Sequence, residues 1–202
     1  MPNDPQEWDE RYRRPGYWAG TDPAEFLVQV MPLLPRGTVL DLASGEGRNA
    51  LFLAAHGFRV FAVERSRVAL EKTEAAARES GIPTHWTSQL VTKLPHAPGV
   101  ALVEADLESF SIPAGQYDVV LCNKYLQRSL FPSLERALRR HGVLIYETYT
   151  LAHLKFPGSG PRNPEFLLRP GELHEAFRGM EILFYSEICA RKGMASLLAR
   201  KV

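Results

Sequence analysis

Residues 39–50 place an apolar strand directly before a turn of small residues, and this arrangement constrains the fold more than any other part of the sequence. The segment reads Val-Leu-Asp-Leu-Ala-Ser-Gly-Glu-Gly-Arg-Asn-Ala. Small residues let the backbone turn tightly and approach a ligand closely, and the N–H groups at the start of the following helix supply hydrogen-bond donors. The segment therefore predicts a strand, a ligand-binding turn and a helix of an α/β sheet.

Asp41, at the end of the expected strand, indicates which ligand the turn holds. A carboxylate aimed into the turn repels a pyrophosphate but attracts a positively charged amino group. This charge favours S-adenosyl-L-methionine over a dinucleotide. The spacing Gly45-x-Gly47-x-x-Ala50, with an acid further on, also fits the dinucleotide fingerprint, so an NAD-linked oxidoreductase stays open as an alternative.

Two further acids end the apolar runs that follow. Glu64 comes after an expected helix over 46–56 and a short strand, where it is placed to bind a ribose diol. Asp106 ends the next run and is placed to accept a hydrogen bond from an adenine amino group. Each acid alone also fits a helix start or an N-cap. Together the three acids fall at the carboxyl ends of strands, where open α/β sheets bind ligands.

The segments that carry Asp41, Glu64 and Asp106, together with residues 117–123 and 142–147, resemble the class I S-adenosylmethionine-dependent methyltransferases, in the group of tellurite-resistance and thiopurine type enzymes. The resemblance implies an α/β fold: a Rossmann-like, doubly wound, seven-stranded, mostly parallel sheet with an antiparallel C-terminal hairpin strand. It implies a single domain over 1–202. The sequence departs from the family pattern at Ala43, which replaces a usual glycine, and at Arg140-His141-Gly142, which replaces Pro-Gly-Gly.

The resemblance also implies which residues meet the ligands. The residues expected to bind the cofactor are Asp41, Ala43, Ser44, Gly45, Glu46, Gly47, Arg48, Asn49, Glu64, Arg65, Ser66, Asp106, Leu107, Cys122 and Asn123. Those expected to line the acceptor site are Tyr12, Trp18, Lys124, Tyr125, Arg128, Tyr149 and Arg162. Lys124 and Arg128 have an ordinary alternative as solvated charges at a helix start.

No constellation identifies a catalytic base. A thiolate or selenolate acceptor needs none, whereas a hydroxyl or amine needs one. Plausible positions are held by Tyr125, Tyr146, Glu147, Tyr149 and His153. We expect methyl transfer to a small molecule such as a thiol, metalloid, amine or carboxylate. Convergence of Arg128, Arg162 and Arg169 on the cleft would favour an anionic acceptor. A non-catalytic protein that binds the cofactor is a further alternative.

The remaining segments predict what surrounds the site. Residues 1–20, rich in aromatic and basic side chains, are expected to form a cap over the cofactor, and the Gly- and Pro-rich stretch within 150–170 a substrate lid. Helices are expected over 67–80, 130–140 and 170–177, and strands over 142–148, 180–190 and 194–201. Residues 84–99 are read as an excursion or surface loop, of unassigned role.

Composition is that of an ordinary globular protein. The chain has 202 residues, 45% of them hydrophobic, and a formal net charge of +1, which gives no strong signal for nucleic acid or membrane. Two cysteines and unclustered histidines predict neither a disulfide framework nor a metal site. With no readable signal peptide, we expect a cytoplasmic protein that is a monomer or small homo-oligomer.

Overall fold

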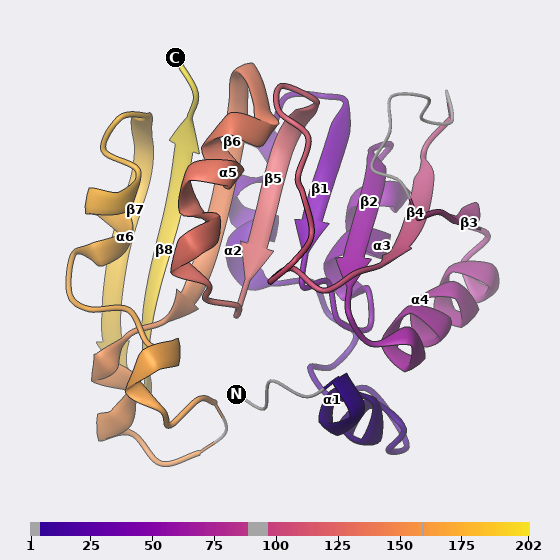
Figure 1. Cartoon of the computed structure of the whole chain (residues 1–202), viewed down its shortest axis with the longest axis horizontal. Coiled ribbons are helices and arrows are strands. Elements are labelled where there is room, and N and C mark those ends of the chain that lie inside the picture. The colour runs from indigo at the N-terminus through magenta and orange to yellow at the C-terminus, as the bar shows by residue number, and fades with distance from the viewer. Residues whose placement is uncertain (1–4, 89–96, 159) are drawn as a thin grey trace.

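The computed structural model describes residues 5–88, 97–158 and 160–202, and these form a single eight-stranded sheet with helices on both faces (Figure 1). The strand order is β3-β4-β2-β1-β5-β6-β8-β7. The pairs from β3 to β6 are parallel, and β8 pairs antiparallel with both β6 and β7. The strands are β1 (Thr38–Leu42), β2 (Arg59–Glu64), β3 (Thr84–Trp86), β4 (Gly99–Glu104), β5 (Tyr117–Asn123), β6 (Leu138–Tyr149), β7 (Glu181–Ala190) and β8 (Lys192–Arg200).

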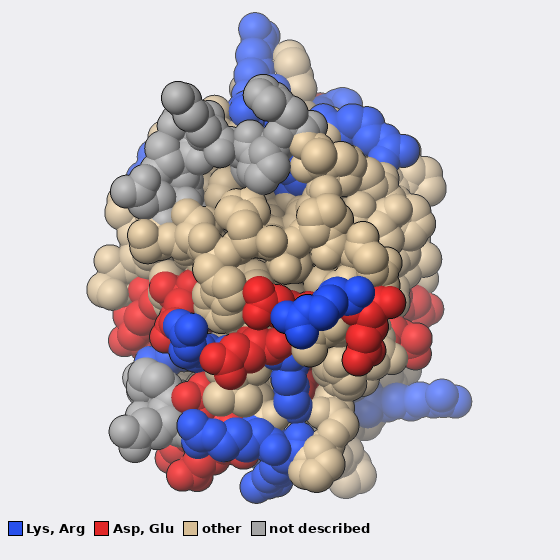
Figure 2. All heavy atoms as spheres, turned by 90° about the vertical axis from the view of Figure 1, so that its right-hand side faces the viewer, with Lys and Arg blue, Asp and Glu red and all other residues tan. Residues whose placement is uncertain are grey.

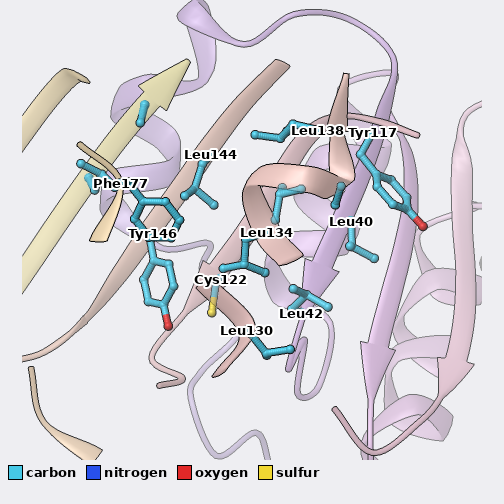
Figure 3. Close-up of a cluster of buried hydrophobic side chains, with 14 of the residues drawn as sticks. Leu40, Leu42, Tyr117, Cys122, Leu130, Leu134, Leu138, Leu144, Tyr146 and Phe177 are labelled. Carbon is cyan, nitrogen blue, oxygen red and sulfur yellow. The ribbon is translucent and has the colours of Figure 1, made fainter. Parts of the chain in front are cut away.

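The helices divide the core into two clusters because the central strands are apolar on both faces. On one face Leu134 of α5 and Leu173 of α6 pack with Tyr117, Tyr146 and other side chains of the sheet (Figure 3). The other face carries α2, α3 and α4. The helices are α1 (Pro5–Tyr12), α2 (Glu25–Val30), α3 (Arg48–Ala55), α4 (Arg67–Glu79), α5 (Phe131–Ala137) and α6 (Glu172–Ala176), with short 3-10 helices at Met31–Leu33, Arg128–Leu130, Leu151–Lys155 and Pro164–Phe166.

The predicted doubly wound sheet and C-terminal hairpin are confirmed, but the strand count of seven is too low. The additional strand, β3, pairs parallel with β4 at the edge of the sheet, inside the segment expected to be an excursion. It spans three residues, too few to show an alternating pattern. Residues 89–96 of that segment lie outside the described part of the chain.

The predicted boundary between the fifth helix and the next strand is also wrong. The helix expected over 130–140 ends at Ala137, and β6 begins at Leu138 rather than at Gly142. The chain bends inside β6, where His141 has a φ of +64° and the strand register shifts against β5. The bend favours glycine at position 142, because an added Cβ would lie 3.1 Å from the Asp118 carbonyl oxygen.

The start of α4 follows the prediction closely. Ser66 is the N-cap, and its side chain accepts a hydrogen bond from Ala69 N at 3.2 Å. The buried residues of the helix, Ala69, Leu70, Thr73 and Ala77, recur on one face. No helix in the described residues has the length and apolar character required to cross a membrane.

Candidate functional site

A cavity of about 840 Å³ opens at the carboxyl ends of β1, β2, β4 and β5. Its lining comes from these strand ends, from the N-terminal segment and from residues 160–166 beyond β6. The predicted positions that line it are Tyr12, Trp18, Asp41, Ala43, Ser44, Gly45, Glu46, Arg48, Asn49, Glu64, Arg65, Asp106, Leu107, Asn123, Lys124, Tyr125, Tyr149 and Arg162. The structure therefore brings most of the predicted cofactor and acceptor positions to one cavity.

The turn after β1 is built from left-handed residues. Ala43, Gly45 and Gly47 have φ values of +52°, +56° and +77°. Ala43 adopts the conformation that the family's glycine would hold more readily, so this departure leaves the turn intact. Gly47 is also required for packing, because an added Cβ would lie 2.2 Å from Thr73 Cγ2 of α4. Its conformation makes Gly47 the N-cap and delays the start of α3 to Arg48.

Asp41 lies beneath this turn as an incompletely paired carboxyl group. The residue is 1% exposed, and its Oδ2 has no hydrogen-bond partner among the described residues. Burial raises the pKa of this carboxyl to about 8, against the opposing effect of Arg48, and Glu64 raises it further. An unsatisfied buried acceptor is costly, and a cationic hydrogen-bond donor entering the cavity would offset that cost. Asp41 thus fits the ammonium group of an amino-acid ligand.

Glu64 organises the turn, a role that the sequence did not reveal. Its Oε2 accepts a hydrogen bond from Gly45 N, and its Oε1 accepts from Arg65 N and Ser66 N, each at 3.0 Å. Burial raises the pKa of Glu64, and these three N–H donors lower it. A carboxylate has about four acceptor positions, so the group retains capacity for one ribose hydroxyl.

Asp106 faces the same cavity from the loop after β4. Its Oδ2 lies 3.4 Å from Arg65 Nη2, and its Oδ1 accepts a hydrogen bond from Glu108 N at 3.0 Å. These contacts fix the carboxylate beside the predicted adenine position.

The N-terminal segment is attached across the turn through Glu46, whose anchoring role the sequence analysis missed. Trp18 N donates to Glu46 Oε2 at 2.6 Å, and Lys72 Nζ donates to Glu46 Oε1 at 2.8 Å. Lys72 also binds the carbonyl oxygens of Arg14 and Gly16. This segment, residues 5–20, is called the cap below.

Arg48 and Asn123, on the far side of the cavity, belong to a polar network at the ends of β5 and β6. Arg48 Nη2 donates to Asn123 Oδ1 at 3.1 Å, and Asn123 Nδ2 donates to Glu147 Oε1 at 3.3 Å. Ser196 Oγ donates to the other oxygen of Glu147 at 2.9 Å. Lys124 follows with a φ of +56°, and its N–H donates to the Glu147 carbonyl at 2.7 Å.

Arg128 does not line the acceptor site. It forms two hydrogen bonds with the carboxylate of Glu172, at 2.5 and 2.9 Å, and donates to the carbonyl oxygens of Glu165 and Leu167. Arg169 also pairs with Glu172, at 3.4 Å. The three arginines whose convergence would favour an anionic acceptor therefore do not converge, because Glu172 pairs with Arg128 and Arg169. Of the three, Arg162 alone lines the cavity, and it also donates to the carbonyl oxygens of Phe156 and Gly158.

Three predicted cofactor positions lie outside the lining. Gly47 packs on α4 and Ser66 caps it. Cys122 points into the core, where burial raises the pKa of its thiol to about 12 and Sγ donates to the Tyr125 carbonyl. The candidate base Tyr146 is buried beside it and donates to the same carbonyl at 2.9 Å (Figure 3). Tyr146 is thus occupied in the core and does not face the cavity.

The sequence is similar to those of known methyltransferases. Residues 40–146 match the family described as "Methyltransferase domain". The ribosomal RNA small subunit methyltransferase B of Thermus thermophilus is 27% identical over 158 residues, which are 72% of this chain but 40% of that protein. The chain thus spans less than half the length of that relative.

Solved structures share the fold at low sequence identity. TehB from Haemophilus influenzae superposes with a TM-score of 0.68 and 18% identity, over 92% of this chain and 64% of that chain. An S-adenosylmethionine dependent methyltransferase from Mesorhizobium loti superposes with a TM-score of 0.66 and 19% identity, over 90% of this chain and 100% of that chain.

Proposed function

This chain belongs to the methyltransferase domain family, and we propose that it is an S-adenosylmethionine-dependent methyltransferase that methylates a small-molecule acceptor in the cavity above β1 and β5. The observation that carries the assignment of the site is Asp41, a buried carboxyl group beneath a glycine-bearing turn, one oxygen of which has no hydrogen-bond partner among the described residues. That group suits a ligand ammonium and not a pyrophosphate.

The other lining residues support this placement. Asp41 would hold the ammonium group of the cofactor, Glu64 a ribose hydroxyl and Asp106 the adenine amino group. The bound cofactor supplies an electrophilic methyl group on sulfur. The chain's own contribution is to align the acceptor and exclude water, and alignment contributes about 7–11 kcal/mol in well-oriented systems.

The size of the cavity and the aromatic residues at its border favour a small acceptor. Trp18 of the cap and Phe166 beyond β6 both border it. We propose that the cap and residues 150–170 act as the two covers of one domain over 1–202. A cavity of about 840 Å³ lies within the usual range for small ligands, roughly 300–1,000 Å³.

The lower half of the face shown in Figure 2 gives no support to a nucleic-acid acceptor of the kind named for the Thermus relative. On the face shown in Figure 2, basic side chains are interleaved with acidic ones over its lower half. Arg67 illustrates this, since it pairs with Glu71 and with Glu104, both at 3.1 Å. Nucleic-acid binding instead favours clustered basic side chains on one face.

Calorimetric titration with S-adenosylmethionine, S-adenosylhomocysteine and NAD tests the proposal. We expect the first two to bind and Asp41→Asn to weaken that binding by about tenfold or more. The control is Glu181→Gln, which removes an exposed acid paired with Arg200. Binding of NAD alone, or unchanged affinity in Asp41→Asn, would contradict the site assignment. Cofactor binding without turnover on any thiol, metalloid, amine or carboxylate would favour a non-catalytic protein.

A further inference from the structure

The cavity has a second compartment on the β5 and β6 side. Asp41 lies near the end of β1, Glu64 ends β2 and Asp106 follows β4. These strands are consecutive in the sheet order β4-β2-β1. Lys124 follows β5, on the opposite side of β1. A cofactor held by the three acids therefore lies across β1, β2 and β4, and a second ligand lies beside Lys124. This placement relies on the proposed function.

The charged groups that act on Lys124 in this compartment are two cations and one carboxylate. Among the residues that the structure describes, the Lys124 amine makes neither a hydrogen bond nor an ion pair. Burial lowers its pKa, and so do the nearby cations Arg48 and Lys192, while Glu147 opposes them. Both carboxylate oxygens of Glu147 already accept hydrogen bonds, from Asn123 and Ser196. The half-buried amine therefore lies near two cations and one carboxylate, and among the described residues no carboxylate forms an ion pair with it.

Arg48 is fixed near this amine by three hydrogen bonds and retains unused N–H donors. Its Nη1 donates to the carbonyl oxygens of Ala19 and Asp22, at 3.3 and 3.1 Å, and its Nη2 donates to Asn123. A guanidinium has five N–H donors, so Nε and one hydrogen of Nη2 are left over. Two cations whose remaining donors border one cavity form a suitable site for an oxyanion.

The backbone holds Lys124 in an unusual conformation at this position. Its φ of +56° lies in the left-handed region, which glycine and asparagine adopt at lower cost than lysine. Strain of this kind concentrates at ligand-binding sites. The hydrogen bond from Lys124 N to the Glu147 carbonyl fixes the residue there. The conformation thus agrees with a role for the lysine side chain in the cavity.

We infer that the methyl acceptor is a small organic anion whose carboxylate, or a group of similar shape and charge, binds Lys124 Nζ with Arg48 alongside. Its apolar body packs against Tyr149 and Phe166, which line the same cavity. Lys124 is then a specificity-determining residue of the acceptor site. The other possible source of such a carboxylate is the amino-acid portion of the cofactor, and the test separates the two.

The test uses the full chain saturated with S-adenosylhomocysteine. Acetate, phenylacetate and benzoate are titrated by calorimetry beside their neutral amides. We expect at least one carboxylate to bind about tenfold more tightly than its amide. In Lys124→Met this preference is lost, whereas Lys124→Arg restores it and the exposed control Arg178→Met, outside the cavity lining, leaves it unchanged. Affinity for S-adenosylhomocysteine stays within about twofold in all variants.

Two results overturn the inference. If none of the three carboxylates binds the wild-type protein more tightly than its amide, an anionic acceptor is excluded, even if Lys124→Met does not fold. Loss of S-adenosylhomocysteine affinity in Lys124→Met, with the carboxylate preference intact, assigns the lysine to the cofactor. Failure of the wild-type protein to bind S-adenosylhomocysteine at the outset contradicts the proposed function instead, so the two failures are distinguishable.

Discussion

The ion pair between Arg128 and Glu172 holds the segment over 164–172 against the sheet. Arg128 binds the Glu172 carboxylate through two hydrogen bonds and also binds the carbonyl oxygens of Glu165 and Leu167. Phe166 lies between those two carbonyls and lines the cavity. We therefore predict that Glu172→Gln destabilises the protein and loosens this wall of the site.

The magnitude follows from the pKa of Glu172. The hydrogen bond from Arg128 lowers it from 4.5 to about 2, against an opposing effect of burial and with help from Arg169. A shift of this size corresponds to an upper limit of about 3 kcal/mol. The Arg128 side chain is 38% exposed, so solvent screening reduces the expected loss in Glu172→Gln to about 1–2 kcal/mol at neutral pH.

The sign of the pH dependence is fixed by the same shift. Because the folded protein holds the Glu172 proton less tightly than the unfolded chain, the stabilisation is complete above about pH 4.5 and is lost as the pH falls towards 2. Urea unfolding of wild type and Glu172→Gln should thus differ by about 1–2 kcal/mol at pH 7 and by less than half of that near pH 3. The control Glu175→Gln removes an exposed pair with Arg178 and should have little effect. A difference that is equal at both pH values would refute the electrostatic explanation.

Three further predictions concern the turn and the cap. Asp41→Asn should raise the thermal stability of the ligand-free protein near pH 8, because the wild type has by then lost the stability that protonated Asp41 supplies at lower pH. The same substitution should weaken S-adenosylhomocysteine binding. A change in the same direction for thermal stability and for binding affinity would contradict this account of Asp41. Gly47→Ala should lower the free energy of unfolding in urea by about 2 kcal/mol or more, because of the left-handed φ at this position and the clash with Thr73. The double variant Gly47→Ala with Thr73→Ala should recover only part of that loss. Full recovery would refute the backbone contribution. Glu46→Gln should accelerate limited proteolysis within residues 13–20, because the ion pair between Glu46 and Lys72 is lost. Added S-adenosylhomocysteine should slow this cleavage. An unchanged cleavage rate in Glu46→Gln would show that the cap is held by other contacts.

The sequence revealed the parts of the fold that local patterns determine. The strand and turn over 39–47 were predictable because continuous apolar residues and glycines act within a few positions of each other. The end of α5 was not, because residues 130–140 follow a helical pattern and only pairing with β5 draws residues from Leu138 onward into a strand. Tertiary pairing overrides local preference in the same way at β3, which has a strand to pair with and almost no pattern of its own.

The site was predictable in position but less so in the role of each charge, and Lys124 and Arg128 show why. Both follow β5, and both were expected to face the acceptor. The partner of Arg128, Glu172, lies 44 positions away, so nothing near Arg128 in the sequence shows that its charge is already neutralised inside the protein. Lys124 forms no ion pair with a carboxylate among the described residues, and the charged groups that act on it are the cations Arg48 and Lys192 and the acid Glu147. A charged residue in a predicted cleft is available to a ligand only when the fold leaves it without an internal partner, and on that criterion the acceptor site centres on Lys124 rather than on Arg128.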